Sequence, residues 1–186
     1  MTDISPSQYG TLARRLKQYI KFYGGWSAIF SSPFFWLAFF ICMINYTMWD
    51  SEAWLPLAQS LLPNLLGFSL GTYAILFSII NNRLKRALRE VPNSRGIPYL
   101  FEMNATFFHF LITQVVALIW TFIYTGTLWF DILTYAKLEP EVLVQVLFAL
   151  KMSGGFIGML LLVYSTTLII AAAMVVYRLA MIKEPN

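Results

Sequence analysis

The side chains able to do chemistry are few, and they lie within or beside long apolar runs. His109 is the only histidine, and Glu102 lies seven residues earlier, which places both on one face of a helix. Histidine titrates near neutral pH, so one interpretation is a proton-linked role. The other is a structural histidine that is hydrogen-bonded to a neighbouring helix. Two further polar side chains in apolar runs, Asn45 and Gln114, carry no such signal.

No combination of residues in the sequence is typical of catalysis or metal binding. The single histidine has no matching nucleophile and acid, and no metal-ligand spacing such as HExxH is present. Cys42 is the only cysteine, so a disulfide within the chain is impossible. We therefore predict a protein that is not an enzyme, with no catalytic residues, no metal ligands and no cofactor.

The composition indicates a membrane protein. Of 186 residues, 59% are hydrophobic and 12% are charged, against roughly 45–50% and about 25% in soluble domains. Several apolar runs reach the roughly 18 residues that cross a bilayer core. The net charge of +4 comes from residues beside these runs, where anionic lipid explains it better than nucleic acid does.

The apolar runs predict an all-α bundle of four membrane-spanning helices within residues 33–180. The predicted spans are residues 33–49, 58–80, 104–130 and 155–177. Trp49 and Trp54 are expected at the membrane interface, and Pro63 is expected to kink the second span. Residues 142–152 are a separate lead-in helix or an extension of the last span outside the bilayer. Lys151 is expected at the outer interface, with its ammonium near Glu139 or Glu141.

Residues 1–32 precede the first span and include a predicted amphipathic helix at residues 5–23. A capping pattern at Ser5, Pro6 and Gln8 would begin the helix. Five apolar side chains share one face: Leu12, Leu16, Tyr19, Ile20 and Tyr23. Two interpretations remain open, a helix lying on the surface of an anionic membrane and a solvated helix packed on its own bundle.

The positions of the basic residues predict the orientation. Four precede the first span, five lie between the second and third spans, and two follow the last, so eleven of thirteen share one side. Positive charge marks the cytoplasmic side of a membrane. We therefore expect a multi-pass protein of the bacterial inner membrane with both termini cytoplasmic, a basic extension at residues 81–98 and a tail at 181–186.

Small and polar residues form a stripe on the second span. At spacings of four and three they are Ser60, Asn64, Gly67, Gly71, Ala74 and Ser78. Such residues allow close helix packing in lipid, either with another helix of the same chain or between protomers, where they would line a narrow path. Asn64 is expected to bond the carbonyl that Pro63 leaves free. Gly154 and Gly158 form a second GxxxG motif, which predicts helix packing.

The basic segments predict a docking surface for a cytosolic protein or anionic lipid. Its candidate residues are Arg14, Arg15, Lys17, Lys21, Arg83, Lys85, Arg86 and Arg89. The size, the four spans, the cytoplasmic termini and the Arg83–Arg89 extension after LLPNLLGFSLG together resemble small membrane subunits of bacterial anti-phage defence, such as the membrane component of Kiwa and superinfection-exclusion proteins.

Two functions follow as expectations. The first is a homo-oligomeric membrane subunit that anchors or regulates a cytosolic partner and senses disturbance of the membrane; the sensing rests on the resemblance. The alternative is a small homo-oligomeric ion channel or pore lined by the stripe.

Overall fold

The structure, a computed structural model, describes residues 8–135 and 139–181, and of residues 128–130 it describes the backbone alone. Helices are the regular elements of this part of the chain, and one isolated antiparallel bridge joins Pro92 to Pro98. The helices are α1 (Gln8–Tyr23), α2 (Gly25–Phe30), α3 (Pro33–Ile44), α4 (Tyr46–Asp50), α5 (Trp54–Ile79), α6 (Asn82–Glu90), α7 (Tyr99–Thr125), α8 (Leu128–Tyr135) and α9 (Pro140–Ala180).

Three described helices are long and apolar enough to cross a membrane, namely α5, α7 and α9. A fourth apolar helix, α3, has twelve residues and is shorter than this criterion. Length and composition thus identify an all-α membrane protein.

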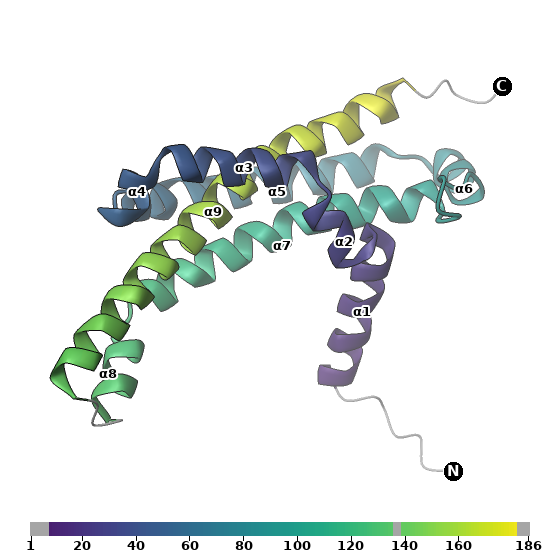
Figure 1. Cartoon of the computed structure of the whole chain (residues 1–186). Helices are drawn as coiled ribbons and strands as arrows, with labels where there is room; N and C mark the ends of the chain where they lie inside the picture. Colours follow the sequence, from purple (N-terminus) through teal and green to yellow (C-terminus); the bar gives the residue numbers. More distant parts are fainter. Residues whose placement is uncertain (1–7, 136–138, 182–186) are drawn as a thin grey trace, which may run out of the picture.

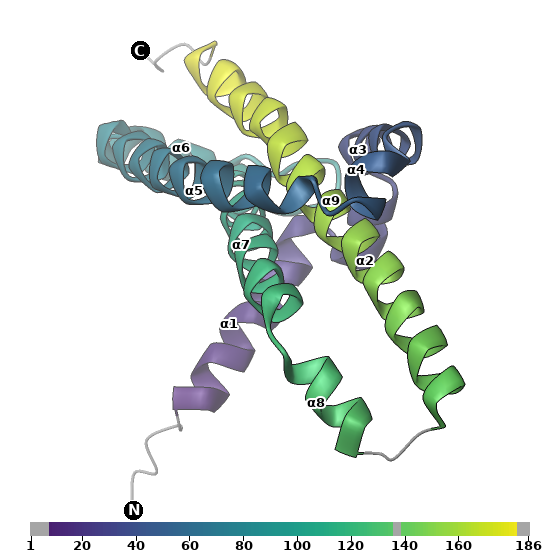
Figure 2. The same ribbon diagram turned by 90° about the vertical axis from the view of Figure 1, so that its left-hand side faces the viewer.

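The apolar helices run alternately up and down the bundle. α3 and α7 run in one direction and α5 and α9 in the other, so α4 and α8 lie toward one end and α6 toward the opposite end (Figure 1). α1 does not follow this direction but projects sideways from α7 (Figure 1). α8 and the first turns of α9 extend beyond the rest of the bundle (Figures 1 and 2).

The helix bounds differ from the predicted span bounds at three places, and each difference has a local cause. The first predicted span is two helices, because Asn45 leaves the helical conformation and donates its side-chain N–H to the carbonyl of Ile41 at 2.8 Å. The third ends at Thr125, before an extended Gly126. The last apolar region is one helix of 41 residues without a break at Ser153, because in lipid a helix alone satisfies the backbone hydrogen bonds.

The interior consists of two clusters of buried side chains. One lies toward α6 and includes Met103, Phe107 and Leu168. The other lies toward α4 and includes Trp54, Leu62 and Met159. α3, α5, α7 and α9 each contribute to both clusters, and α9 packs against the other three helices.

Glycines let α9 approach the two tryptophans at the α4–α5 end. A Cβ on Gly158 would lie 2.1 Å from the Trp54 ring, and a Cβ on Gly155 would lie 2.5 Å from the Trp49 carbonyl oxygen. A Cβ on Gly154 would lie 3.0 Å from the Tyr124 ring. The second GxxxG motif therefore packs against its own chain. Trp54 is 1% exposed and belongs to the core, so its ring packs inside the bundle and does not face the surroundings.

We predict that Gly158→Val destabilises the bundle by about 1–3 kcal/mol or more, because the added carbons overlap Trp54. The measurement is the free energy of unfolding of monomeric protein in a detergent titration, followed by circular dichroism. Gly71→Val is the control, since a Cβ at Gly71 meets nothing within 4 Å. An equal loss at both positions would contradict this packing.

Candidate functional site

The C-terminal end of α1 is joined to α7 and α9 by a chain of polar side chains. The Tyr19 hydroxyl lies 2.5 Å from His109 Nδ1, and the Tyr164 hydroxyl lies 2.9 Å from His109 Nε2. A neutral imidazole donates from one nitrogen and accepts at the other, so one tyrosine donates to His109 and the other accepts from it. His109 is 4% exposed. It is thus a histidine bonded to neighbouring helices, which is the structural interpretation.

Aromatic contacts pack α1 against α7 on both sides of this chain. The Tyr23 ring stacks on His109 with centroids 4.0 Å apart, and the Phe22 ring stacks on Phe101 at 5.1 Å. Burial raises the pKa of the Tyr19 and Tyr23 phenols. Both phenols therefore stay protonated at neutral pH, and Tyr19 keeps a proton to share with His109.

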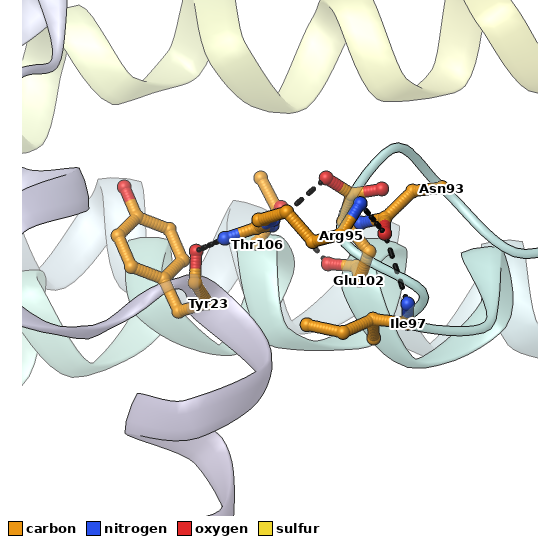
Figure 3. Close-up of polar contacts among 6 residues, drawn as sticks. All are labelled: Tyr23, Asn93, Arg95, Ile97, Glu102 and Thr106. Carbon is orange, nitrogen blue, oxygen red and sulfur yellow. Dashed lines mark hydrogen bonds and ion pairs between the residues drawn. The ribbon is translucent and has the colours of Figure 1, made fainter.

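A second polar contact between α1 and α7, here called the Arg95 joint, is centred on Arg95 in the loop between α6 and α7 (Figure 3). Its Nη1 donates to the Tyr23 carbonyl oxygen at 3.0 Å, and its Nη2 donates to Glu102 Oε1 at 3.1 Å. The last carbonyls of a helix carry partial negative charge and have no partner within the helix. Arg95 supplies that partner, so the guanidinium caps α1 while the carboxylate of α7 holds it.

Hydrogen bonds within the loop fix the position of Arg95. Asn93 Oδ1 accepts from the backbone N–H groups of Arg95 at 2.8 Å and Ile97 at 2.9 Å (Figure 3). Gly24 follows α1 with φ of 117°, and a Cβ there would lie 2.0 Å from Arg95 Nη1. Only glycine allows this approach without strain.

The Arg95 joint was not predicted from the sequence. Arg95 was counted among the cytoplasmic basic residues, and Glu102 was expected on the same helix face as His109, whereas Glu102 pairs with Arg95. The available signals were Gly24 at the end of the predicted amphipathic helix and the turn residues around Arg95. Neither signal connects two segments that lie 72 positions apart.

The interpretation of α1 as a helix packed on its own bundle holds for the C-terminal half of the helix. The C-terminal half packs on α7 through Tyr19, Phe22 and Tyr23. In the N-terminal half the apolar side chains Tyr9 and Leu12 are 85% and 59% exposed. α1 therefore has an apolar surface that its own bundle does not cover. The predicted cap at Ser5 and Pro6 lies outside the described residues.

The predicted docking residues lie on α1 and α6, and nearly all are exposed. On α1 these are Arg14, Arg15, Lys17 and Lys21, and on α6 they are Arg83, Lys85, Arg86 and Arg89, of which Lys85 is half-buried. The ion pairs in the described part of the chain are Arg95–Glu102 and Lys151–Glu52. The eight cations thus carry charge that this part of the chain does not neutralise.

α6 is positioned by its cap and by one apolar anchor. Asn81 Oδ1 accepts from the Leu84 backbone N–H at 2.7 Å and so begins the helix. Leu88 is buried against the cluster that contains Met103 and Phe107. The basic side chains of α6 are therefore held at a defined position on the bundle.

The stripe on α5 faces away from its own chain. All six of its residues are exposed, and a Cβ on Gly67 or Gly71 would meet nothing within 4 Å. The interpretation of this stripe as a tight contact with another helix of the same chain is therefore wrong. Asn64 donates to the Ser60 carbonyl oxygen at 2.8 Å, which is one residue beyond the carbonyl that Pro63 frees.

The remaining polar candidates lie apart from one another. Lys151 Nζ pairs with Glu52 Oε1 at 3.2 Å, and not with the predicted Glu139 or Glu141. Gln114 is buried between α7 and α5, where it donates to Ser69 Oγ at 3.0 Å. In residues 8–135 and 139–181 no three His, Cys, Asp or Glu side chains are grouped as metal ligands.

Comparisons with protein-family models, with curated proteins and with solved structures found no match to this chain.

We predict that Arg95→Ala loosens α1 without unfolding the bundle. The substitution leaves the Tyr23 carbonyl and Glu102 without their shared donor, a loss of roughly 1–2 kcal/mol for a partly exposed group, or a five- to thirtyfold change in an equilibrium. The measurement is hydrogen exchange of the α1 amides in lipid nanodiscs, which should accelerate. Arg89→Ala, at an exposed residue on α6, is the control. Unchanged exchange in Arg95→Ala would show that the joint does not hold α1.

Proposed function

We propose that the chain is a non-enzymatic, homo-oligomeric membrane subunit that anchors or regulates a cytosolic partner and responds to disturbance of the bilayer. The observation that carries the proposal is the set of eight cations on α1 and α6, exposed or half-buried and without an ion pair in the described part of the chain. Basic side chains without an ion pair, on helices that are held in place on the bundle, can bind an acidic protein surface or anionic lipid headgroups.

The proposed placement has four crossings and both termini in the cytoplasm of a bacterium. α5, α7 and α9 supply three crossings, and α3 with α4 supplies the fourth. At 1.5 Å per residue the 12 residues of α3 extend about 18 Å, and α4 continues the crossing of the roughly 30 Å hydrocarbon core after the break at Asn45. The basic residues of α1 and α6 then face the cytoplasm.

α1 is the proposed sensor of the bilayer. It projects sideways from α7, so it lies along the membrane surface when α7 crosses the membrane (Figure 1). Its exposed Tyr9 and Leu12 would enter the interface. The contacts of Tyr19 and Arg95 connect its other end to α7 and α9. A sensor of this kind is what the resemblance to anti-phage defence subunits implies.

The exposed stripe on α5 supports the homo-oligomer. In lipid, small residues on a helix surface favour close association with another helix, and Gly67 and Gly71 have no neighbour within their own chain. A symmetric contact between the stripes of neighbouring protomers would cover them.

The same stripe supports the alternative function, a small homo-oligomeric channel. Ser60, Asn64 and Ser78 bring polar atoms to an exposed face of an otherwise apolar helix. Around a symmetry axis these atoms would line a narrow path.

We predict that reversing the charge of Arg83, Lys85, Arg86 and Arg89 to Glu releases the cytosolic partner while the bundle stays folded. The four side chains do not contribute to the buried clusters, so the thermal unfolding temperature should change little. The measurement is co-purification from native membranes in mild detergent.

The matched control exchanges Lys and Arg at the same four positions, which keeps the charge and should keep the partner. If the reversed variant retains its partner, α6 is not the docking surface.

We predict that Gly71→Leu dissociates the oligomer, because the added side chain separates the protomers, while each protomer stays folded. The mass of the intact particle in mild detergent is the measurement, and ion flux in liposomes is measured in parallel. Phe68→Leu, at an exposed residue outside the stripe, is the control. If the mass of the Gly71→Leu particle is unchanged, the stripe does not form the contact between protomers. Flux through the unmodified protein that Gly71→Leu alters would favour the channel.

A further inference from the structure

A cavity of about 680 Å³ lies at the end of the bundle opposite α6. It is bounded by the last turns of α7, the first half of α9 and the turn between α4 and α5. This volume is within the range of about 300–1,000 Å³ that is typical of small-molecule sites. Its apolar wall consists of Leu55, Ile123, Leu147, Leu150 and Ile157.

The polar wall carries one anion and one cation in contact. Glu52 Oε1 lies 3.2 Å from Lys151 Nζ. The Tyr124 hydroxyl lies 3.3 Å from Glu52 Oε1 and 3.3 Å from the Lys151 carbonyl oxygen. Glu52 lies in the left-handed region with φ of 62°, a conformation that a residue with a side chain rarely adopts.

Both charged groups can be reached from outside the protein. The side chain of Lys151 is 50% exposed and that of Glu52 is 41% exposed. A carboxylate keeps further acceptor positions and an ammonium keeps further donors after one ion pair has formed. A ligand with one charge of each sign would complete a ring of four alternating charges.

We infer that this cavity binds a zwitterionic phospholipid that carries a primary ammonium, that is, a phosphatidylethanolamine. Its ammonium lies on Glu52, its phosphate lies on Lys151, and the start of an acyl chain lies along Ile123 and Ile157, on the side of Lys151 that faces the bundle. This inference depends on α7 and α9 lying in a membrane, but not on the proposed cytosolic partner.

Charge complementarity distinguishes this lipid from the other common ones. The phosphate of an anionic lipid such as phosphatidylglycerol could pair with Lys151, but its headgroup brings no cation of its own to Glu52, so the repulsion between phosphate and carboxylate is not offset. A phosphatidylcholine has the required charges, but its quaternary ammonium has no N–H group to donate to the carboxylate. A primary ammonium supplies that charge-assisted hydrogen bond.

The experiment is native mass spectrometry of the full chain, delipidated in mild detergent and titrated with phosphatidylethanolamine, phosphatidylcholine and phosphatidylglycerol of equal chain length. We expect one phosphatidylethanolamine per chain, bound about tenfold more tightly than either other lipid. In Glu52→Gln the preference over phosphatidylcholine should disappear. In Lys151→Gln binding of phosphatidylethanolamine should weaken about tenfold.

Two further variants keep the test independent of folding. Leu147→Trp fills the cavity while the Glu52–Lys151 pair stays in place, and it should abolish the tight site. Lys21→Gln, on α1, should leave it unchanged. Equal binding of all three lipids, a preference for phosphatidylglycerol, or a preference that persists in both Glu52→Gln and Lys151→Gln would overturn the inference. So would a native oligomer in which a second copy closes the cavity and no lipid binds.

Discussion

The close approach of α9 to Trp49 and Trp54 is the contact on which the rest of the bundle depends. Water does not drive helices together inside a bilayer, so van der Waals contact at short range must do so. The short distance is possible because α9 has glycines at the contact, namely Gly154, Gly155 and Gly158. The large aromatic side chains opposite them supply the contact area. Because α9 packs against α3, α5 and α7, its position affects where those three helices lie.

The polar side chains of the bundle follow the same constraint. Most satisfy the carbonyls of their own helix, as Asn45, Ser69 and Ser165 do. The polar contacts between segments are fewer, and some lie inside the bundle, such as those of Gln114 with Ser69 and of Thr167 with the Phe34 carbonyl. Tyr19 and Arg95 join α1 to the bundle at one end, and Glu52 and Lys151 pair at the other. The ion pairs of the described part of the chain thus lie toward the ends of the bundle, whereas its middle combines apolar packing with a few neutral hydrogen bonds.

The sequence predicted what composition and periodicity determine, namely an all-α membrane protein with long apolar helices and an amphipathic first helix. It did not predict what depends on contact between distant segments. The stripe on α5 and the motif at Gly154 and Gly158 look alike in one dimension, yet the first is exposed and the second is buried. Spacing shows that a helix has a face of small residues, but only the other helices decide what that face meets. Arg95 was assigned to the cytoplasmic charges for the same reason.

The length of α9 has a mechanical consequence. Its 41 residues form a rod of about 60 Å at 1.5 Å per residue, twice the thickness of a hydrocarbon core of about 30 Å. A helix longer than the bilayer adjusts to a change in thickness by tilting, and a rod without a break transmits that tilt along its whole length. Tyr164 lies on this rod and contacts His109, which also contacts α1. A change in the tilt of α9 would therefore move Tyr164, in the middle of this helix, and with it the histidine that α1 also contacts.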